Sequence, residues 1–316
     1  MAHHLLPGIG VTMDRKTSLV AVVVSAACFS TLGILTELAY RQGAQPLPLL
    51  AWRFALVALL MGGYQLLRDP GVLVAGLQDI WRYVALALAG YGASSICFFF
   101  ALKQASPAIV AVLLYTYPAM VSVLSAVFFK ERFTSQRIVA LLLSFVGCAL
   151  VLGVLTTSAA ASPLGILLGL GAALGYSLFN LLSYRWLPGR SRLVLQTYTF
   201  GLSAIVIGLL TLVTGGSLSV SAWTPTLWGY VALIVVVPTL LAVTLYLNGI
   251  RHLGPAQAAI VSTAEPLFTI VFAWMVLGDR LTPIQLAGAL LVVGGVVAAE
   301  WGPPRPSVHP DELAAI

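Results

Sequence analysis

Apolar runs of about 20 residues follow one another along nearly the whole chain, separated only by short loops. A helix of that length crosses the hydrocarbon core of a bilayer, which is about 30 Å thick. Only 8% of the residues are charged, whereas a soluble domain carries about a quarter charged residues. No stretch between the runs is long enough for a separate soluble domain. The sequence therefore predicts an all-α integral membrane protein.

Ten transmembrane helices are expected, at about 17–40, 47–67, 80–102, 106–129, 134–155, 163–185, 192–214, 228–250, 255–277 and 282–300. Basic residues test this arrangement, because cytoplasmic loops hold the excess of Lys and Arg. With the N-terminus inside, only Arg41, Lys103 and Arg280 fall on the external side, and Arg53 alone lies at depth within a span. This uneven distribution predicts that both tails lie in the cytoplasm. We therefore interpret the net charge of +6 as a signal for orientation in the membrane and not for binding to nucleic acid.

The two halves of the chain resemble each other. The segment "KQASPAIVAVLLYTYPAMVSVLSAVFFKERFT", from Lys103, aligns without gaps on "RHLGPAQAAIVSTAEPLFTIVFAWMVLGDRLT", from Arg251. Pro118 falls on Pro266, and the acid-base pair "ER" falls on "DR". A shared apolar pattern alone does not align prolines and charged pairs together, so we interpret the chain as a duplication of a five-helix unit.

Because five is an odd number, the second copy enters the membrane from the opposite side. The expected organisation is an N-terminal tail 1–16, repeats 17–155 and 163–300, and a C-terminal tail 301–316. Inverted repeats around a central cavity are typical of alternating-access transporters. The alternative is that duplication served only to build a bundle. Ten spans already enclose a pathway, so a monomer is sufficient.

These segments, together with "WRF" early in the second span, resemble the EamA type of the drug/metabolite transporter superfamily. The resemblance covers residues 17 to 300, and the two repeat segments are its most specific part. It implies a ten-helix carrier of the bacterial inner membrane, in a family of which many members export amino acids or other metabolites. Some members of that family need no coupling ion.

Polar side chains gather near mid-depth in spans 1, 3, 4, 6, 8 and 9. Such groups are costly in hydrocarbon and tend to face a cavity or another helix, so these six helices are expected to surround a pathway. Spans 5 and 10 carry small residues that suit tight helix packing. The substrate-pathway candidates are Tyr91, Ser94, Ser95, Tyr115, Tyr117, Tyr176, Asn180, Thr239 and Glu265. The alternative for each Ser or Thr is a bond to the carbonyl of its own helix, four residues earlier.

Prolines predict breaks in three of these spans. Pro118 and Pro266 each remove a backbone hydrogen bond and crowd the carbonyl four residues earlier, so both helices are expected to kink near the midplane. Pro238 predicts a similar irregularity in span 8. Such a kink opens a pocket, frees a carbonyl or provides a point of flexing during gating, and the alternative is that it only improves packing.

Two charged residues lie near the external ends of the first two spans. Arg53 is about two turns into span 2, and Glu37 is about one turn from the end of span 1. We expect an ion pair between them with a structural or gating role. Snorkelling of Arg53 toward the interface is the alternative.

The number of basic residues within the membrane limits the class of substrate that the protein can carry. Carriers of phosphorylated compounds need several fixed positive charges, and only one basic residue lies at depth here. A neutral or zwitterionic metabolite with an apolar or aromatic part, above all an amino acid, fits the tyrosines and hydroxyls better. The alternative substrate is an organic cation, with Glu265 as its counter-charge. Glu265 itself either binds substrate or a proton during the cycle, or serves as a hydrogen-bond partner between helices.

An intramembrane enzyme is a different class that the sequence disfavours. The stretch "GYGASS" at 90–95 offers a serine in a glycine-rich setting, yet nucleophilic hydrolysis needs a base. Every histidine lies in a tail or a loop, so neither a serine-histidine dyad nor a metal site is expected within the membrane. No GxxxxGK[ST] loop is present for a nucleotide. No cofactor is expected.

Overall fold

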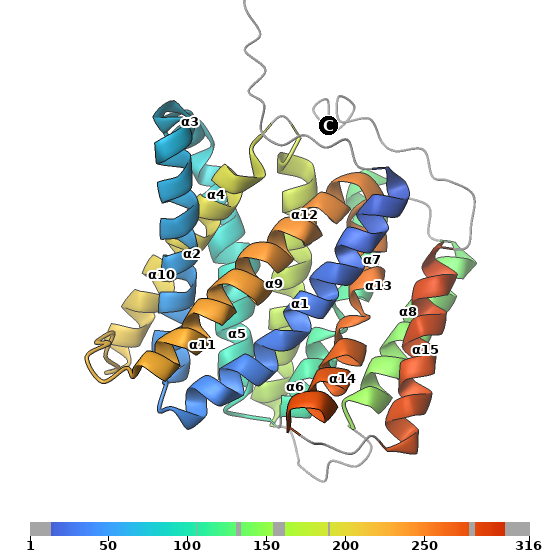
Figure 1. Cartoon of the computed structure of the whole chain (residues 1–316). Helices are drawn as coiled ribbons and strands as arrows, with labels where there is room; N and C mark the ends of the chain where they lie inside the picture. The colour runs from blue at the N-terminus through green and yellow to red at the C-terminus, as the bar shows by residue number, and fades with distance from the viewer. Residues whose placement is uncertain are drawn as a thin grey trace, which may run out of the picture.

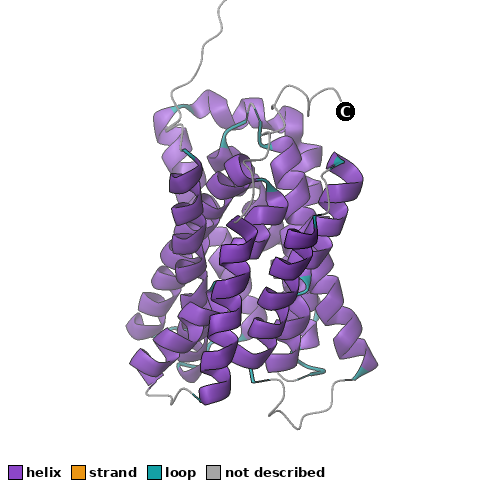
Figure 2. Cartoon of the chain, turned by 90° about the vertical axis from the view of Figure 1, so that its right-hand side faces the viewer, coloured by secondary structure: helices purple, strands orange, loops and turns teal. Residues whose placement is uncertain are grey.

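A computed structural model describes residues 14–105, 107–130, 134–153, 162–188, 190–277 and 282–300. Within these ranges the chain is helical with short connections and no strand (Figure 2). The aligned acid-base pairs, at 131–132 and 279–280, and nearly all of the two tails lie outside the described residues.

The α-helices are α1 (Arg15–Arg41), α2 (Pro46–Arg68), α3 (Pro70–Gly76), α4 (Ile80–Ala85), α5 (Gly92–Ala101), α6 (Pro107–Leu114), α7 (Tyr117–Phe129), α8 (Ser135–Val151), α9 (Pro163–Trp186), α10 (Arg192–Val213), α11 (Pro225–Val235), α12 (Ala242–Leu253), α13 (Pro255–Ser262), α14 (Glu265–Leu277) and α15 (Pro283–Glu300). Eight helical runs of the described chain are long and apolar enough to cross a membrane. Two shorter apolar helices, Ser135–Val151 and Pro283–Ala299, bring the total into agreement with the ten expected spans.

Side-chain caps fix where several helices begin. The Asp14 carboxylate accepts a hydrogen bond from the backbone N–H of Thr17 at 2.8 Å, and α1 starts at the next residue. Ser162 and Thr224 cap α9 and α11 in the same way, each followed by a proline in the first turn. Caps of this kind satisfy N–H groups that have no partner inside the helix.

The two halves have opposite orientations. In Figure 1, α1 begins at the top of the molecule and α15 ends there, so the described chain starts and finishes on the same side. The first helix of the second half, α9, runs in the direction opposite to that of α1. The fold is therefore built from two inverted five-helix repeats, as the alignment of the halves predicts.

Helix packing follows the same symmetry. The second helix of each half packs against its counterpart, α2 on α10, and the fifth helices pair in the same way, α8 on α15. Near the centre α5 packs on α9 and α1 packs on α12. The helices that were expected to surround a pathway therefore form the middle of the bundle, between these two outer pairs (Figure 1).

Glycines set the close approach of α8 and α15. A Cβ atom on Gly288 would lie 2.8 Å from the carbonyl oxygen of Gly147, and one on Gly147 would lie 2.7 Å from that of Gly288. Both separations are too short for a side chain, so the two backbones touch directly. The expectation that spans 5 and 10 pack tightly is confirmed.

The fourth span of each half is broken where a proline predicts it. In the first half α6 ends at Leu114 and α7 starts at Tyr117, just before Pro118. In the second half α13 ends at Ser262 and α14 starts at Glu265, next to Pro266. The breaks occupy equivalent positions, because each proline lacks the N–H that would continue the helix.

The third span of each half contains a π-helical segment, Leu86–Tyr91 in the first half and Val236–Leu241 in the second. Pro238 lies within the second segment, where the Thr239 hydroxyl bonds the Ile234 carbonyl five residues earlier at 2.7 Å. The segment in the first half has no proline and was not predicted. Its irregularity coincides with Gly90, whose φ of −99° and ψ of −114° are not helical.

Candidate functional site

Five aromatic side chains from both halves meet in the middle of the bundle, and we call them the central aromatic cluster: Tyr91, Tyr117, Tyr176, Phe179 and Tyr246. The Tyr176 ring stacks on Phe179 and Tyr246, with centroids 6.1 and 6.4 Å away. Tyr117 and Tyr91 meet Tyr176 edge-on, at 4.8 and 6.1 Å. The first half supplies Tyr91 and Tyr117, so the cluster lies across the junction of the repeats.

Hydrogen bonds hold the polar ends of this cluster. Tyr246 donates to the side-chain oxygen of Asn180 at 2.5 Å, and the Asn180 amide donates to the Tyr176 carbonyl at 2.7 Å. The Tyr117 hydroxyl donates to the Ala259 carbonyl at 3.2 Å. Asn180 and Tyr246 are fully buried. The centre of the protein is thus apolar on the faces of the rings and polar at their edges.

Glu265 lies where the two broken helices approach each other. It is the first residue of α14, and its side chain is a hydrogen-bond partner of Tyr115, which lies in the equivalent break between α6 and α7. The carboxyl also interacts electrostatically with Tyr117, Tyr176 and Tyr246. Glu265 and Tyr115 are only half-buried, so both keep contact with accessible space.

A small pocket opens beside this contact. Its lining comes from both breaks and from α8: Tyr115, Pro118, Ala119, Leu141, Ser144, Phe145 and Thr263. Within the described chain the Ser144 hydroxyl is buried and has no hydrogen-bond partner. The two breaks and α8 therefore leave a small space between them.

The two candidate serines of α5 use their hydroxyls on backbone carbonyls. Ser95 bonds Tyr91 of its own helix at 2.8 Å, as the alternative reading of such residues proposes. Ser94 bonds Ala172 of α9 at 2.8 Å and ties the two helices together. Ser95 thus reaches the cluster only through the Tyr91 backbone, and Ser94 bonds none of its members.

The expected ion pair between Glu37 and Arg53 is wrong. Glu37 instead pairs with Arg41, one turn further along α1, at 3.0 Å on the exposed surface. Arg53 points inward, where its Nε donates to the Thr239 hydroxyl at 2.7 Å and Tyr91 is a further hydrogen-bond partner. The residue is only 7% exposed, which also rules out snorkelling to the interface.

Sequence reasoning missed Tyr246. The expected end of span 8 placed this residue close to the membrane surface, where tyrosines are common. In the structure α12 continues to Leu253, and Tyr246 is fully buried with its ring against Tyr176. The sequence offers no direct signal for it, because the π-helical segment Val236–Leu241 changes the direction of the residues that follow.

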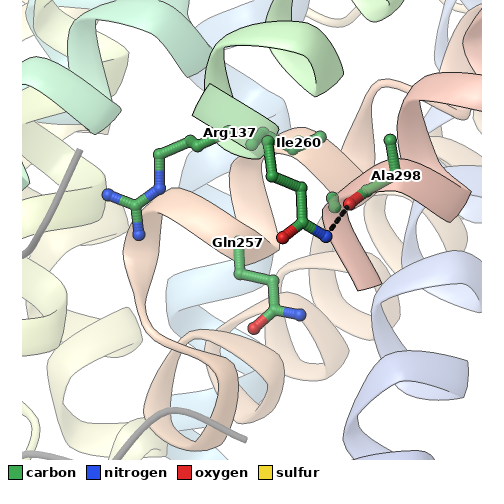
Figure 3. Close-up of a pocket in the computed structure, with 6 residues that line it drawn as sticks. Arg137, Gln257, Ile260 and Ala298 are labelled. Atoms are coloured by element: carbon green, nitrogen blue, oxygen red, sulfur yellow. Dashed lines mark hydrogen bonds between the residues drawn. The ribbon is translucent and has the colours of Figure 1, made fainter. Parts of the chain in front are cut away.

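A second polar pocket lies between α8, α13 and α15 (Figure 3). Arg137 is almost fully buried here, and Gln257 is buried nearby. The Gln136 amide donates to the Ala298 carbonyl at 2.7 Å. The printed bond joins α8 to α15, and α13 contributes Gln257 and Ile260 to the lining.

The fold and the buried polar centre are those of a multi-pass membrane transporter, and comparisons with known proteins give its family. The chain belongs to the EamA-like transporter family, whose model matches residues 16–153 and again residues 163–299. The two matches correspond to the two halves of the bundle.

Relatives in other organisms carry names of the same kind. The chain is 24% identical over 270 residues to the uncharacterized transporter YyaM of Bacillus subtilis, covering 84% of this chain and 88% of that protein. It is 26% identical over 288 residues to the uncharacterized transporter YcbK of the same organism, covering 90% and 91%. An uncharacterized transporter of Archaeoglobus fulgidus is 29% identical over 226 residues, covering 71% and 79%.

Solved structures share the fold, among them a crystal structure described as that of a protein. It superposes with a TM-score of 0.77 over 90% of this chain and 98% of that one, at 20% sequence identity.

Proposed function

We propose that this protein is a secondary transporter of the bacterial inner membrane that exports small neutral or zwitterionic metabolites, most of all aromatic or other hydrophobic amino acids. The observation that carries the proposal is the central aromatic cluster, in which stacked rings are edged by hydroxyl and amide groups. Such a surface matches a small molecule with an apolar body and a polar end. Both tails lie in the cytoplasm, consistent with the basic residues on that side.

Alternating access is the mechanism that this architecture supports. The cluster contains residues of both inverted halves, so a movement of one half against the other separates its rings. Each half also contains a π-helical segment and a break close to the cluster. These irregular segments are the points at which the central helices bend most readily, because fewer helical hydrogen bonds hold them.

The names of the relatives are consistent with transport but state no substrate. General similarity of this sequence to the aromatic amino-acid exporter YddG, within the same family, supports an amino acid as the cargo. The central aromatic cluster supports the same class.

An organic cation is the second candidate substrate. It is favoured by Glu265, which keeps accessible surface next to tyrosines that offer cation-π contacts. In this case Glu265 exchanges a proton for the cation during each cycle.

Counterflow in proteoliposomes distinguishes these candidates. Purified protein is reconstituted with unlabelled phenylalanine inside, and uptake of labelled phenylalanine is measured with methionine or a quaternary ammonium compound as competitor. We expect phenylalanine and methionine to compete and the quaternary compound to have little effect. Preferential competition by the cation, or uptake of the labelled cation in place of phenylalanine, overturns the amino-acid proposal.

A further inference from the structure

Arg53 presents a buried guanidinium group with an unused donor. Its Nε bonds Thr239, but within the described chain its Nη2 atom is buried and has no hydrogen-bond partner. No described carboxylate contacts the group, because Glu37 is held by Arg41. The other polar neighbours that interact with it are the hydroxyls of Tyr91 and Tyr40.

A buried cation without an anion is costly, both because it loses its hydration and because each unpaired donor adds a penalty. An arginine with a purely structural role would be expected to use its remaining donors on backbone carbonyls or a carboxylate. Arg53 instead keeps Nη2 free at the side of the central aromatic cluster. Nη2 is therefore available to an anion that is not part of the described chain.

We infer that Arg53 binds the carboxylate of the transported molecule, with Thr239 and Tyr91 holding the guanidinium in place. The inference rests on the proposed function and narrows its substrate class to carboxylates with an apolar or aromatic body. A guanidinium presents parallel N–H groups that match the two oxygens of a carboxylate.

Tyr91 connects this anion site to the aromatic surface. Its hydroxyl interacts with Arg53, while its ring contacts Phe179 at 5.1 Å and Tyr176 at 6.1 Å. A carboxylate held by Arg53 therefore leaves the rest of the molecule beside the rings of the cluster. Glu265, at the break between α13 and α14, interacts with the same cluster, and its carboxyl can face an ammonium group.

The partners of Arg53 also lie on the irregular parts of the third spans. Tyr91 is the last residue of one π-helical segment, and Thr239 is within the other. An anion that binds the guanidinium and shifts its position also moves Tyr91 and Thr239. It therefore affects both π-helical segments at once. Binding at Arg53 is thereby coupled to the places where the two halves bend.

The experiment compares three analogues as competitors of labelled phenylalanine in proteoliposomes. Phenethylamine lacks the carboxylate, 3-phenylpropionate lacks the ammonium group, and phenylalanine has both. In the wild type we expect phenethylamine to compete at least about tenfold more weakly than phenylalanine, whereas 3-phenylpropionate still competes. In Arg53→Gln the difference between phenylalanine and phenethylamine should fall to about twofold or less.

The control is Arg41→Gln, which removes an exposed arginine near the same end of the protein and should leave the difference unchanged. Arg53→Lys keeps the positive charge but lacks the paired N–H groups of the guanidinium. It should therefore retain part of the difference between phenylalanine and phenethylamine. If Arg53→Gln elutes as aggregate, Tyr91→Phe provides the same test by removing only a hydroxyl. Equal competition by phenethylamine in the wild type, or an unchanged difference in Arg53→Gln or Tyr91→Phe, overturns the carboxylate site while leaving transport intact.

A separate binding measurement tests the anion site even if the protein does not transport phenylalanine. If the wild type shows no counterflow of phenylalanine, thermal unfolding of the detergent-solubilised protein is followed with 3-phenylpropionate and with its alcohol, 3-phenylpropanol. Stabilisation by the carboxylate that is absent with the alcohol and lost in Arg53→Gln supports the anion site. Equal effects of both compounds, or no effect of either, overturn it.

Discussion

The Tyr117 hydroxyl donates a hydrogen bond to the Ala259 carbonyl, and this contact joins the broken helix of the first half to the broken helix of the second. The donor lies just after the break between α6 and α7, and the acceptor lies one turn before the break between α13 and α14. The two discontinuities are therefore fastened to each other across the centre of the protein.

Tyr117→Phe removes this bond and leaves the ring in place. We expect a loss of at least about 1 kcal/mol in the free energy of unfolding, because the hydroxyl gives up its bond to Ala259 and its contacts with Ser262 and Tyr246. Unfolding in mixed micelles with increasing SDS measures the change. Tyr64→Phe, at a tyrosine exposed on the surface, is the control and should change stability little. A loss of the same size in both variants would show that the contact between the breaks does not stabilise the fold.

Asn180→Ala should be more damaging, since Asn180 both accepts from Tyr246 and donates to the Tyr176 carbonyl. The buried Tyr246 hydroxyl then loses this acceptor and keeps only Tyr117 as a partner, at a cost of about 1–3 kcal/mol. A double-mutant cycle with Tyr246→Phe checks this reason. The double variant is expected to lose less than the sum of the single losses by at least about 0.5 kcal/mol, and strict additivity would contradict the pairing.

Glu265→Gln keeps the shape of the side chain and its contact with Tyr115 but removes the ability to take up a proton. If Glu265 carries a proton during transport, the dependence of counterflow on pH should become flat in the variant. Glu37→Gln, which alters an exposed carboxyl, is the control. Rates equal to those of the wild type at every pH would instead leave Glu265 as a hydrogen-bond partner only.

Gly288→Ala tests the close approach of α8 and α15. The added methyl group meets the Gly147 carbonyl oxygen and the backbone nitrogen of Val151, neither of which can move without displacing a helix. Overpacking of this kind costs about 1–3 kcal/mol. Gly294→Ala on the same helix has its nearest neighbour at 3.9 Å and should be tolerated. Similar thermal stabilities of the two variants would contradict the direct backbone contact.

The number of spans, their inverted halves and the breaks at Pro118 and Pro266 follow from the sequence, because hydropathy and proline chemistry depend on positions along the chain. The inward direction of Arg53 does not follow from it. Hydropathy gives the depth of a residue but not the side of the helix on which it lies, so Glu37 and Thr239 were equally available as partners. The π-helical segment ending at Tyr91 was missed because Gly90, unlike a proline, does not forbid an ordinary helix.

The two π-helical segments have a consequence for how the third spans can move. A π turn holds one more residue than an α turn, so residues beyond it are rotated by about 100° relative to an uninterrupted α-helix. If the extra residue shifts along the helix, Tyr91 or Thr239 turns away from the neighbouring span while the ends of the helix stay in place. Each half thus contains a segment in which such a shift rotates the side chains. The side chains that face the centre then change, while the helix does not slide through the membrane.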